Sequence, residues 1–89
     1  MPGGSVGGMM KAEVFVTLKS GVLDPQGKVI ARSLRALGFE EVRGVRQGKY
    51  MVIDLEGVAP EEARKRLDEM CQKLLANTVI ENYRVRVEG

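Results

Sequence analysis

The side chains that usually carry enzyme chemistry are scarce in this sequence. Histidine is absent from all 89 residues, which removes the commonest general base and the commonest zinc ligand. The single cysteine, Cys71, has no histidine to pair with, and its place on an apolar helical stripe is typical of a packed, inert thiol. Ser5, Ser20 and Ser33 lie outside any G-x-S-x-G elbow. We therefore predict no catalytic residue and no metal site in this chain.

The first candidate binding segment, Gly21–Gly27, precedes a predicted helix. Its two glycines could cradle an anion, but it lacks the Lys-Ser/Thr pair of a Walker loop, and Asp24 would oppose an anion there. Asp24 and Pro25 suit the N-cap and first helical position, since proline needs no hydrogen-bond donor at that place. The segment is interpreted as a helix cap, with partner or ligand contact as the alternative. On the capping interpretation, Asp24→Asn would leave folding nearly unchanged.

A second candidate is a basic turn. Arg46 and Lys49 flank Gln47-Gly48, which is predicted to be the tight turn between two strands. Because exposed turns often carry contacts to other molecules, the turn is either a solvated surface or a partner-binding site.

A third candidate is one face of the predicted sheet. Phe15, Tyr50 and Val52 should lie close together on the face that no helix covers. Stacked aromatics on a sheet are typical of RNA-recognition domains, but the aromatic-rich RNP1 pattern is missing, and Glu13 and Asp54 share this face. An apolar strip with balanced charges around it favours association with another protein sheet. We predict self-association through Phe15, Tyr50 and Val52, with RNA as the alternative.

These residues must be positioned by strands and helices that the periodicity reveals. Strict alternation over Lys11–Lys19 predicts a half-buried strand. Further strands are predicted at Glu41–Arg46, with a bulge at Gly44, at Lys49–Leu55 and at Ile80–Val87.

Two helices are predicted between the strands. The first begins at Pro25, after the Asp24 cap, and ends at Gly38, whose freedom to adopt a left-handed conformation suits a helix stop. The second begins at Pro60 and is capped near Asn77. The residues predicted to be buried are Val29, Ile30, Leu34 and Leu37 on the first helix, and Ala63, Leu67, Met70, Cys71, Leu74 and Leu75 on the second.

The resulting order is βαββαβ. It predicts an α+β fold with two layers, of the ferredoxin-like kind, with an antiparallel sheet that is joined to or stacked on a sheet of another subunit. Residues 1–9, rich in glycine, are predicted to be a disordered leader, and residues 10–89 a single domain. A domain this small buries only about 60% of its unfolded surface, so we expect it to gain stability by association.

Composition narrows the range of partners. The formal net charge is +2, from 14 basic and 12 acidic residues, which gives no general attraction to nucleic acid or to acidic membranes. The sequence has no apolar run of the roughly 20 residues that a membrane span needs. One cysteine forms no internal disulfide. A cytoplasmic protein that binds neither nucleic acid nor membrane is expected.

Three stretches together resemble a known family. They are Leu23–Gly27 (LDPQG), Val45–Lys49 (VRQGK) and Met70–Tyr83 (MCQKLLANTVIENY), in family order and spacing. They are similar to the signatures of the PurS family, the small subunit of multi-subunit phosphoribosylformylglycinamidine synthase. The likeness covers residue 11 to about residue 88.

The resemblance implies a role without catalysis. PurS subunits form dimers or tetramers and join a glutaminase, PurQ, to an ATP-dependent synthetase, PurL. The complex is a ligase of purine biosynthesis that converts formylglycinamide ribonucleotide, glutamine and ATP to formylglycinamidine ribonucleotide. The chain would link the two partners and help ammonia pass between them. It would hold no cofactor, since ATP and magnesium would bind to the synthetase.

The candidate partner-binding residues all lie within the three stretches. They are Asp24, Gln26, Arg46, Lys49, Asn77 and Glu81. The alternative to a bridging subunit is a free-standing ferredoxin-like module that senses a small ligand. Co-purification distinguishes the two, because only a bridging subunit would retain PurL and PurQ.

Overall fold

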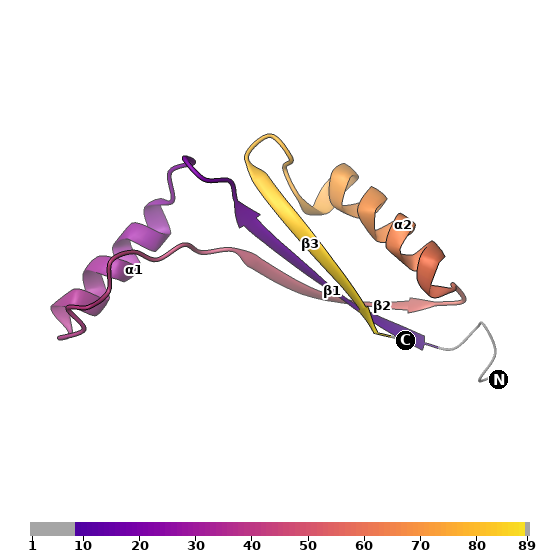
Figure 1. The fold of residues 1–89 in the computed structure, drawn as a ribbon, viewed down its shortest axis with the longest axis horizontal. Helices are drawn as coiled ribbons and strands as arrows, with labels where there is room; N and C mark the ends of the chain where they lie inside the picture. The colour runs from indigo at the N-terminus through magenta and orange to yellow at the C-terminus, as the bar shows by residue number, and fades with distance from the viewer. Residues whose placement is uncertain (1–8, 89) are drawn as a thin grey trace.

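The computed structural model describes residues 9–88; the predicted leader lies outside this range except for Met9, which already belongs to a strand. The elements follow in the order β1 (Met9–Leu18), α1 (Pro25–Ala36), β2 (Lys49–Glu56), α2 (Pro60–Met70), the π-helical turn η1 (Cys71–Leu75) and β3 (Glu81–Glu88). The strands form one antiparallel sheet in the order β2-β1-β3, with β1 in the centre (Figure 1). The predicted α+β fold with an antiparallel sheet is confirmed.

One predicted strand does not form. Residues 42–48 have no regular secondary structure, so the described part of the chain has three strands and not the four of a complete βαββαβ fold. The reason is that no strand within residues 9–88 pairs with this segment. It runs beside the residues that follow β1 and is held there by side chains, as the Arg46 guanidinium donates to the carbonyls of Lys19 and Val22 at 3.0 and 2.8 Å.

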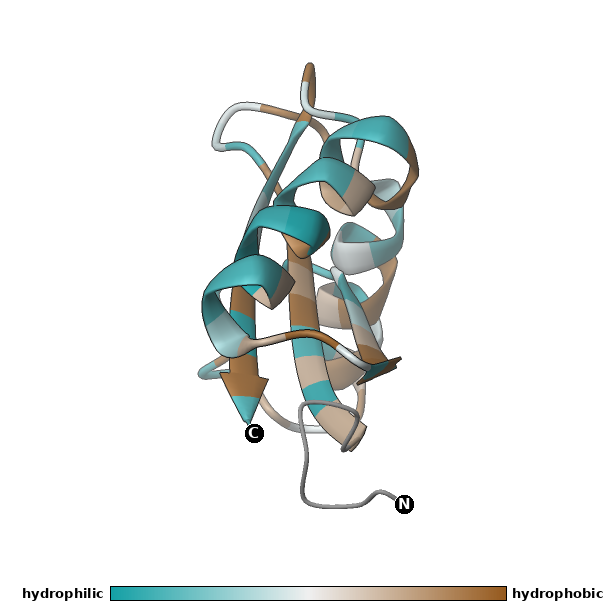
Figure 2. Cartoon of the chain, turned by 90° about the vertical axis from the view of Figure 1, so that its right-hand side faces the viewer, coloured by the Kyte–Doolittle hydropathy of each residue, from teal (hydrophilic) through white to brown (hydrophobic). Residues whose placement is uncertain are grey.

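The core lies between the sheet and α2. Alternate residues of β1, namely Ala12, Val14 and Val16, are almost fully buried, and they pack against Leu67 and Cys71 from the helical layer. Met51, Ile53 and Leu55 of β2 and Tyr83, Val85 and Val87 of β3 flank them. Hydrophobic and hydrophilic residues alternate visibly along the strands (Figure 2). Two layers are thus confirmed for the sheet and α2.

The first helix departs from the prediction. α1 does not lie on the sheet but extends away from it, carried by residues 19–48, which we call the arm (Figure 1). Its predicted inner residues are uncovered: Val29 is 54%, Ile30 39% and Leu37 74% exposed. The radius of gyration is 17.5 Å, whereas a compact domain of this length has about 12 Å. The prediction that Val29, Ile30 and Leu37 are buried was therefore wrong for the described residues 9–88, and Leu34 is only partly buried.

The second helix changes its winding at its end. The amide of Ala76 donates to the carbonyl of Cys71 at 2.9 Å, an i→i+5 bond that widens this turn into a π-helix. The wider turn rotates the following side chains, so that Leu75 packs against the core while Leu74 is 82% exposed. The prediction that Leu74 is buried was therefore wrong. Asn77 does not cap the helix; it begins the turn into β3.

Candidate functional site

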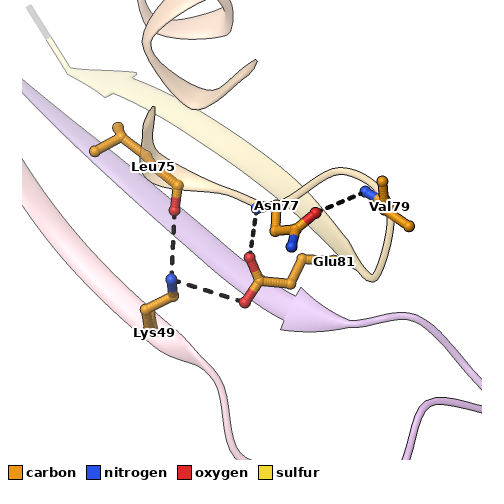
Figure 3. A network of polar contacts seen from close by, with 5 residues as sticks. All are labelled: Lys49, Leu75, Asn77, Val79 and Glu81. Atoms are coloured by element: carbon orange, nitrogen blue, oxygen red, sulfur yellow. Dashed lines mark hydrogen bonds and ion pairs between the residues drawn. The ribbon is translucent and has the colours of Figure 1, made fainter. Parts of the chain in front are cut away.

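Three of the predicted partner-binding residues meet where β2, η1 and β3 converge. The Lys49 ammonium lies 3.7 Å from the Glu81 carboxylate and 3.5 Å from the Leu75 carbonyl oxygen (Figure 3). Glu81 also accepts a 2.7 Å hydrogen bond from the Asn77 amide, and the Asn77 side chain accepts from the Val79 amide at 3.1 Å. The network fixes the turn into β3. The Lys49 side chain stays 57% exposed.

A shallow groove connects this network to the start of α1. It encloses about 350 Å³ and is lined by Asp24, Gln26, Lys49 and Glu81 together with Leu18, Leu23, Pro25, Gln47 and Gly48. The structure thus brings together four of the six predicted residues in one groove, and Asn77 supports it through Glu81. Their common location was not predictable from sequence spacing, because it depends on the arm folding back to β2.

Asp24 is the structural centre of the arm. As predicted, it caps α1: its Oδ1 accepts from the Gly27 amide at 2.9 Å. Residues 42–48, which lead from α1 back to β2, are called the return segment. The Oδ2 of Asp24 accepts a second bond, from the Gln47 amide at 2.7 Å, and so ties the return segment to the helix. These two bonds, led by that from Gln47, and the nearby charge of Arg46 lower the pKa of Asp24 despite its burial. The Asp24 side chain is thus part of the scaffold, and its oxygens face inward.

Arg46 is not at a hairpin tip. Its guanidinium is tied to the carbonyls of Lys19 and Val22, so it holds the two sides of the arm together. It lines a different and larger pocket from that of Lys49. The predicted basic segment is exposed, but it is not the tip of a hairpin, because residues 42–48 form no strand. Arg46 and Lys49 line separate pockets.

The sheet face opposite α2 contains the predicted self-association residues. Phe15 and Tyr50 are paired across β1 and β2, with ring centroids 5.1 Å apart, and Val52 is 48% exposed. The guanidinium of Arg84 lies 4.5 Å from the centroid of the Phe15 ring, which is a cation–π contact. The face is thus an apolar strip with charges beside it, as predicted.

A polar cluster borders this strip. Glu13 accepts hydrogen bonds from the Tyr50 hydroxyl and from Arg86, and these bonds lower the pKa of Glu13. The same carboxylate raises the pKa of Tyr50. Glu13 and Arg86 therefore form an ion pair beside the apolar strip, an arrangement that suits contact with another protein surface.

The remaining reactive groups have structural surroundings. Burial raises the pKa of the Cys71 thiol, with a smaller contribution from the Asp68 charge, so the unreactive thiol is favoured. Asp68 accepts hydrogen bonds from Tyr83 and Gln72 at the edge of the core. Among residues 9–88, no group of three or more histidine, cysteine or acidic side chains is placed to hold a metal ion. In the same range, no helix is long and apolar enough to cross a membrane.

Sequence reasoning missed two residues that the site requires. An ideal Cβ on Gly27 would lie 2.2 Å from the Val45 carbonyl oxygen, so only glycine allows the return segment to pass this close to α1. The Gln47 amide, the second donor to Asp24, was also missed. The closely spaced Asp24, Pro25 and Gly27 were the available signal, but a local motif does not reveal a contact 23 residues away.

Asp24→Asn is expected to destabilise the arm, contrary to the nearly neutral effect that capping alone predicts. Asparagine offers one acceptor oxygen for two amide donors and directs its own N–H groups at the other donor. Acid should also weaken the wild type. Because its pKa is lowered, Asp24 contributes stability above the ordinary aspartate pKa of about 3.9, and this is lost as pH falls through the folded value.

The measurement is amide hydrogen exchange of α1 at neutral pH, with thermal unfolding followed from about pH 7 to pH 3. The variant should exchange faster at neutral pH and lose less stability on acidification. The pKa of Glu13 is also lowered, but Glu13 is present in both proteins, so the difference between them isolates Asp24. Equal exchange of α1 in the two proteins would disprove the double clamp.

The comparisons with known proteins agree with one another. The family model described as PurS, phosphoribosylformylglycinamidine (FGAM) synthase, matches residues 11–89. The PurS subunit of phosphoribosylformylglycinamidine synthase from Bacillus subtilis is 48% identical over 80 residues, which is 90% of this chain and 94% of that subunit.

Solved structures have the same fold. PurS of Methanocaldococcus jannaschii, one of the subunits of formylglycinamide ribonucleotide amidotransferase in the purine biosynthetic pathway, is 44% identical with a TM-score of 0.80, covering 89% of this chain and 95% of that one. A chain of PurLQS from Thermotoga maritima is 33% identical with a TM-score of 0.81, covering 98% and 99%. Sequence and fold agree over nearly the whole length, and the chain belongs to the PurS family.

Proposed function

We propose that this chain is the non-catalytic bridging subunit of a phosphoribosylformylglycinamidine synthase, a ligase complex of purine biosynthesis. It links a PurQ glutaminase to a PurL synthetase and helps ammonia released from glutamine reach the synthetase. The observation that carries the proposal is the match over almost the full chain to a member of the PurLQS assembly of Thermotoga maritima.

The surfaces of the chain support a linking role. The sheet face with Phe15 and Tyr50 is one surface. The exposed stripe of α1 and the groove beside Lys49 form another, since both include Pro25, Gln26 and Gln47. An elongated chain with extents of 54 × 28 × 15 Å can contact more than one partner at once. The same uncovered apolar surfaces support association of the chain with itself as a dimer or tetramer.

The surroundings of the reactive groups support a non-catalytic role. Cys71 is buried with a raised pKa, and the carboxylates of Asp24 and Glu13 are engaged in hydrogen bonds within the chain. These contacts support the proposal that the glutaminase nucleophile and the ATP and magnesium sites belong to the partners. The complex is expected to work in the cytoplasm, where the substrates of purine biosynthesis are made.

Omitting this chain from a reconstituted mixture of PurL and PurQ should abolish most glutamine-dependent product formation. Ammonia that leaves the glutaminase without a linked path is protonated or lost to solvent before it reaches the synthetase. Product formation with ammonium chloride as the nitrogen source should change little, because that reaction needs PurL alone. The measurement is the rate of formylglycinamidine ribonucleotide formation with each nitrogen source.

Titration of the chain into saturating PurL and PurQ provides the control. The glutamine-dependent rate should rise and then level off at a fixed ratio of subunits, and the chain alone should hydrolyse neither glutamine nor ATP. Equal glutamine-dependent rates with and without the chain would disprove the bridging role.

A further inference from the structure

The arm contains a strongly basic pocket outside the groove described above. It lies between α1 and the return segment and encloses about 570 Å³. Its basic lining residues are Lys28, Arg32, Arg35, Arg43 and Arg46. Lys28, Arg32 and Arg35 follow one another at spacings of four and three, so they form one face of α1. The two remaining arginines approach from the return segment.

The positive charge of the pocket is not balanced by neighbouring acids. Of the 14 basic and 12 acidic residues of the chain, the arm holds six and three, so the rest of the chain is slightly acidic. None of the ion pairs formed within residues 9–88 involves a basic residue of the pocket. Asp24 is the single acid in its lining, and both of its oxygens already accept backbone amides.

Several of these charges are held in place. Arg35 donates to the Val42 carbonyl at 3.0 Å, and Arg43 donates to the Glu40 carbonyl at 3.2 Å. Arg46 donates to two carbonyls and keeps three of its five N–H groups free for another acceptor. Carbonyl anchors fix the guanidinium groups without neutralising them, so their ordering entropy is already lost before a ligand arrives.

We propose that this pocket binds a small molecule that carries two or more phosphate groups. Five cations around one concavity complement a polyanion, and arginine forks match phosphate oxygens in pairs. The pocket volume is within the range of about 300–1,000 Å³ that small-molecule sites occupy. A concave site of this size favours a small ligand over an acidic protein surface, which would need a broad and flatter contact.

Binding of such a ligand would also stabilise the groove beside Lys49. Val22, Leu23 and Asp24 contribute to the pocket wall, and Leu23 and Asp24 also line the groove beside Lys49. A ligand that draws α1 and the return segment together would therefore stabilise the Asp24 clamp on which the groove depends. This site is independent of the bridging role, because it is tested on the chain alone.

The test is titration of the full chain with inorganic tripolyphosphate, followed by calorimetry and by thermal unfolding in about 150 mM salt. Wild type should bind saturably and unfold at a higher temperature with ligand. Lys28→Ala with Arg32→Ala should weaken binding at least about tenfold, because charge-assisted bonds to both residues are lost. Neither residue donates a side-chain hydrogen bond within the described chain, so the fold should be kept.

The matched control is Arg64→Ala with Lys65→Ala on α2, which removes the same charge from a surface where acids alternate with bases. The control should bind tripolyphosphate as the wild type does. Absence of saturable binding, or equal weakening in both variants, would overturn the proposal. Displacement of tripolyphosphate by an acidic peptide that binds more tightly would also overturn it, since the pocket would then be a protein-docking site.

Discussion

Gly27→Ala should loosen the arm, although the same change in an ordinary helix usually stabilises it by about 0.5–1 kcal/mol. The sign reverses because the new Cβ would lie 2.2 Å from the Val45 carbonyl oxygen and 2.7 Å from Asp24 Oδ2. A backbone oxygen cannot move aside as a flexible side chain can, so the return segment must shift. Overpacking of this kind costs about 1–3 kcal/mol.

The effect should be measured in the arm itself. α1 does not pack on the sheet, so it can open while the core stays folded. We expect amide exchange in α1 to be roughly 5- to 150-fold faster, the ratio that corresponds to this free-energy range. Exchange in β1 should change much less.

Gly44→Ala is the matched control. It adds the same methyl group to the return segment, on the other side of the contact with α1, but nothing lies within 4 Å of its Cβ. Exchange of α1 should therefore stay near the wild-type rate. If Gly27→Ala and Gly44→Ala gave the same rates, the close approach of α1 to the return segment would not constrain the arm.

The sequence predicted the elements whose partners lie within the chain. Strict alternation in β1 correctly predicted a half-buried strand, because Ala12, Val14 and Val16 are buried by this chain's own helix α2. The Asp24 cap and the Gly38 stop were also found, because both depend on local geometry. Gly38 has φ of +108°, and the Phe39 amide donates to the Leu34 carbonyl behind it, as a left-handed helix end requires.

The failures share a physical cause. An apolar pattern predicts that a residue will be buried, but it does not show whether the residues that bury it belong to the same chain. Ile30 and Leu37 of α1 have the pattern of core residues and are exposed here. Glu41–Arg46 has strand-like residues but no strand beside it, so the backbone is held by Arg46 and Asp24. The π-turn that exposes Leu74 depends on one extra residue in the winding, which periodicity does not reveal.

The candidate site was only partly predictable, because neighbours in sequence do not always share a groove in the fold. Asp24, Gln26, Lys49 and Glu81 were proposed separately, and the structure places them around one groove. Arg46 was proposed with Lys49 because the two are neighbours in sequence, yet the carbonyls of Lys19 and Val22 hold it on the other side of the arm. Their contacts with partners remain predictions.

Phe15→Asp combined with Tyr50→Asp should shift the protein from its oligomer to smaller species. The two rings lie on the sheet face that α2 does not cover, and Tyr50 is 56% exposed there. Two new carboxylates would join Glu13 and Asp54 on this face, and burying them against another subunit would lack compensating charges.

Light scattering at micromolar concentration measures the mass, and circular dichroism measures whether the β-sheet is retained. The matched control is Leu74→Asp with Val79→Asp, which changes two apolar residues that are 82% and 80% exposed but do not belong to this sheet face. The control should keep the wild-type mass, whereas the Phe15 and Tyr50 variant should become smaller or unfold. A wild type that is monomeric at this concentration, or an oligomer that survives both aspartates, would show that the aromatic face is not the self-association surface.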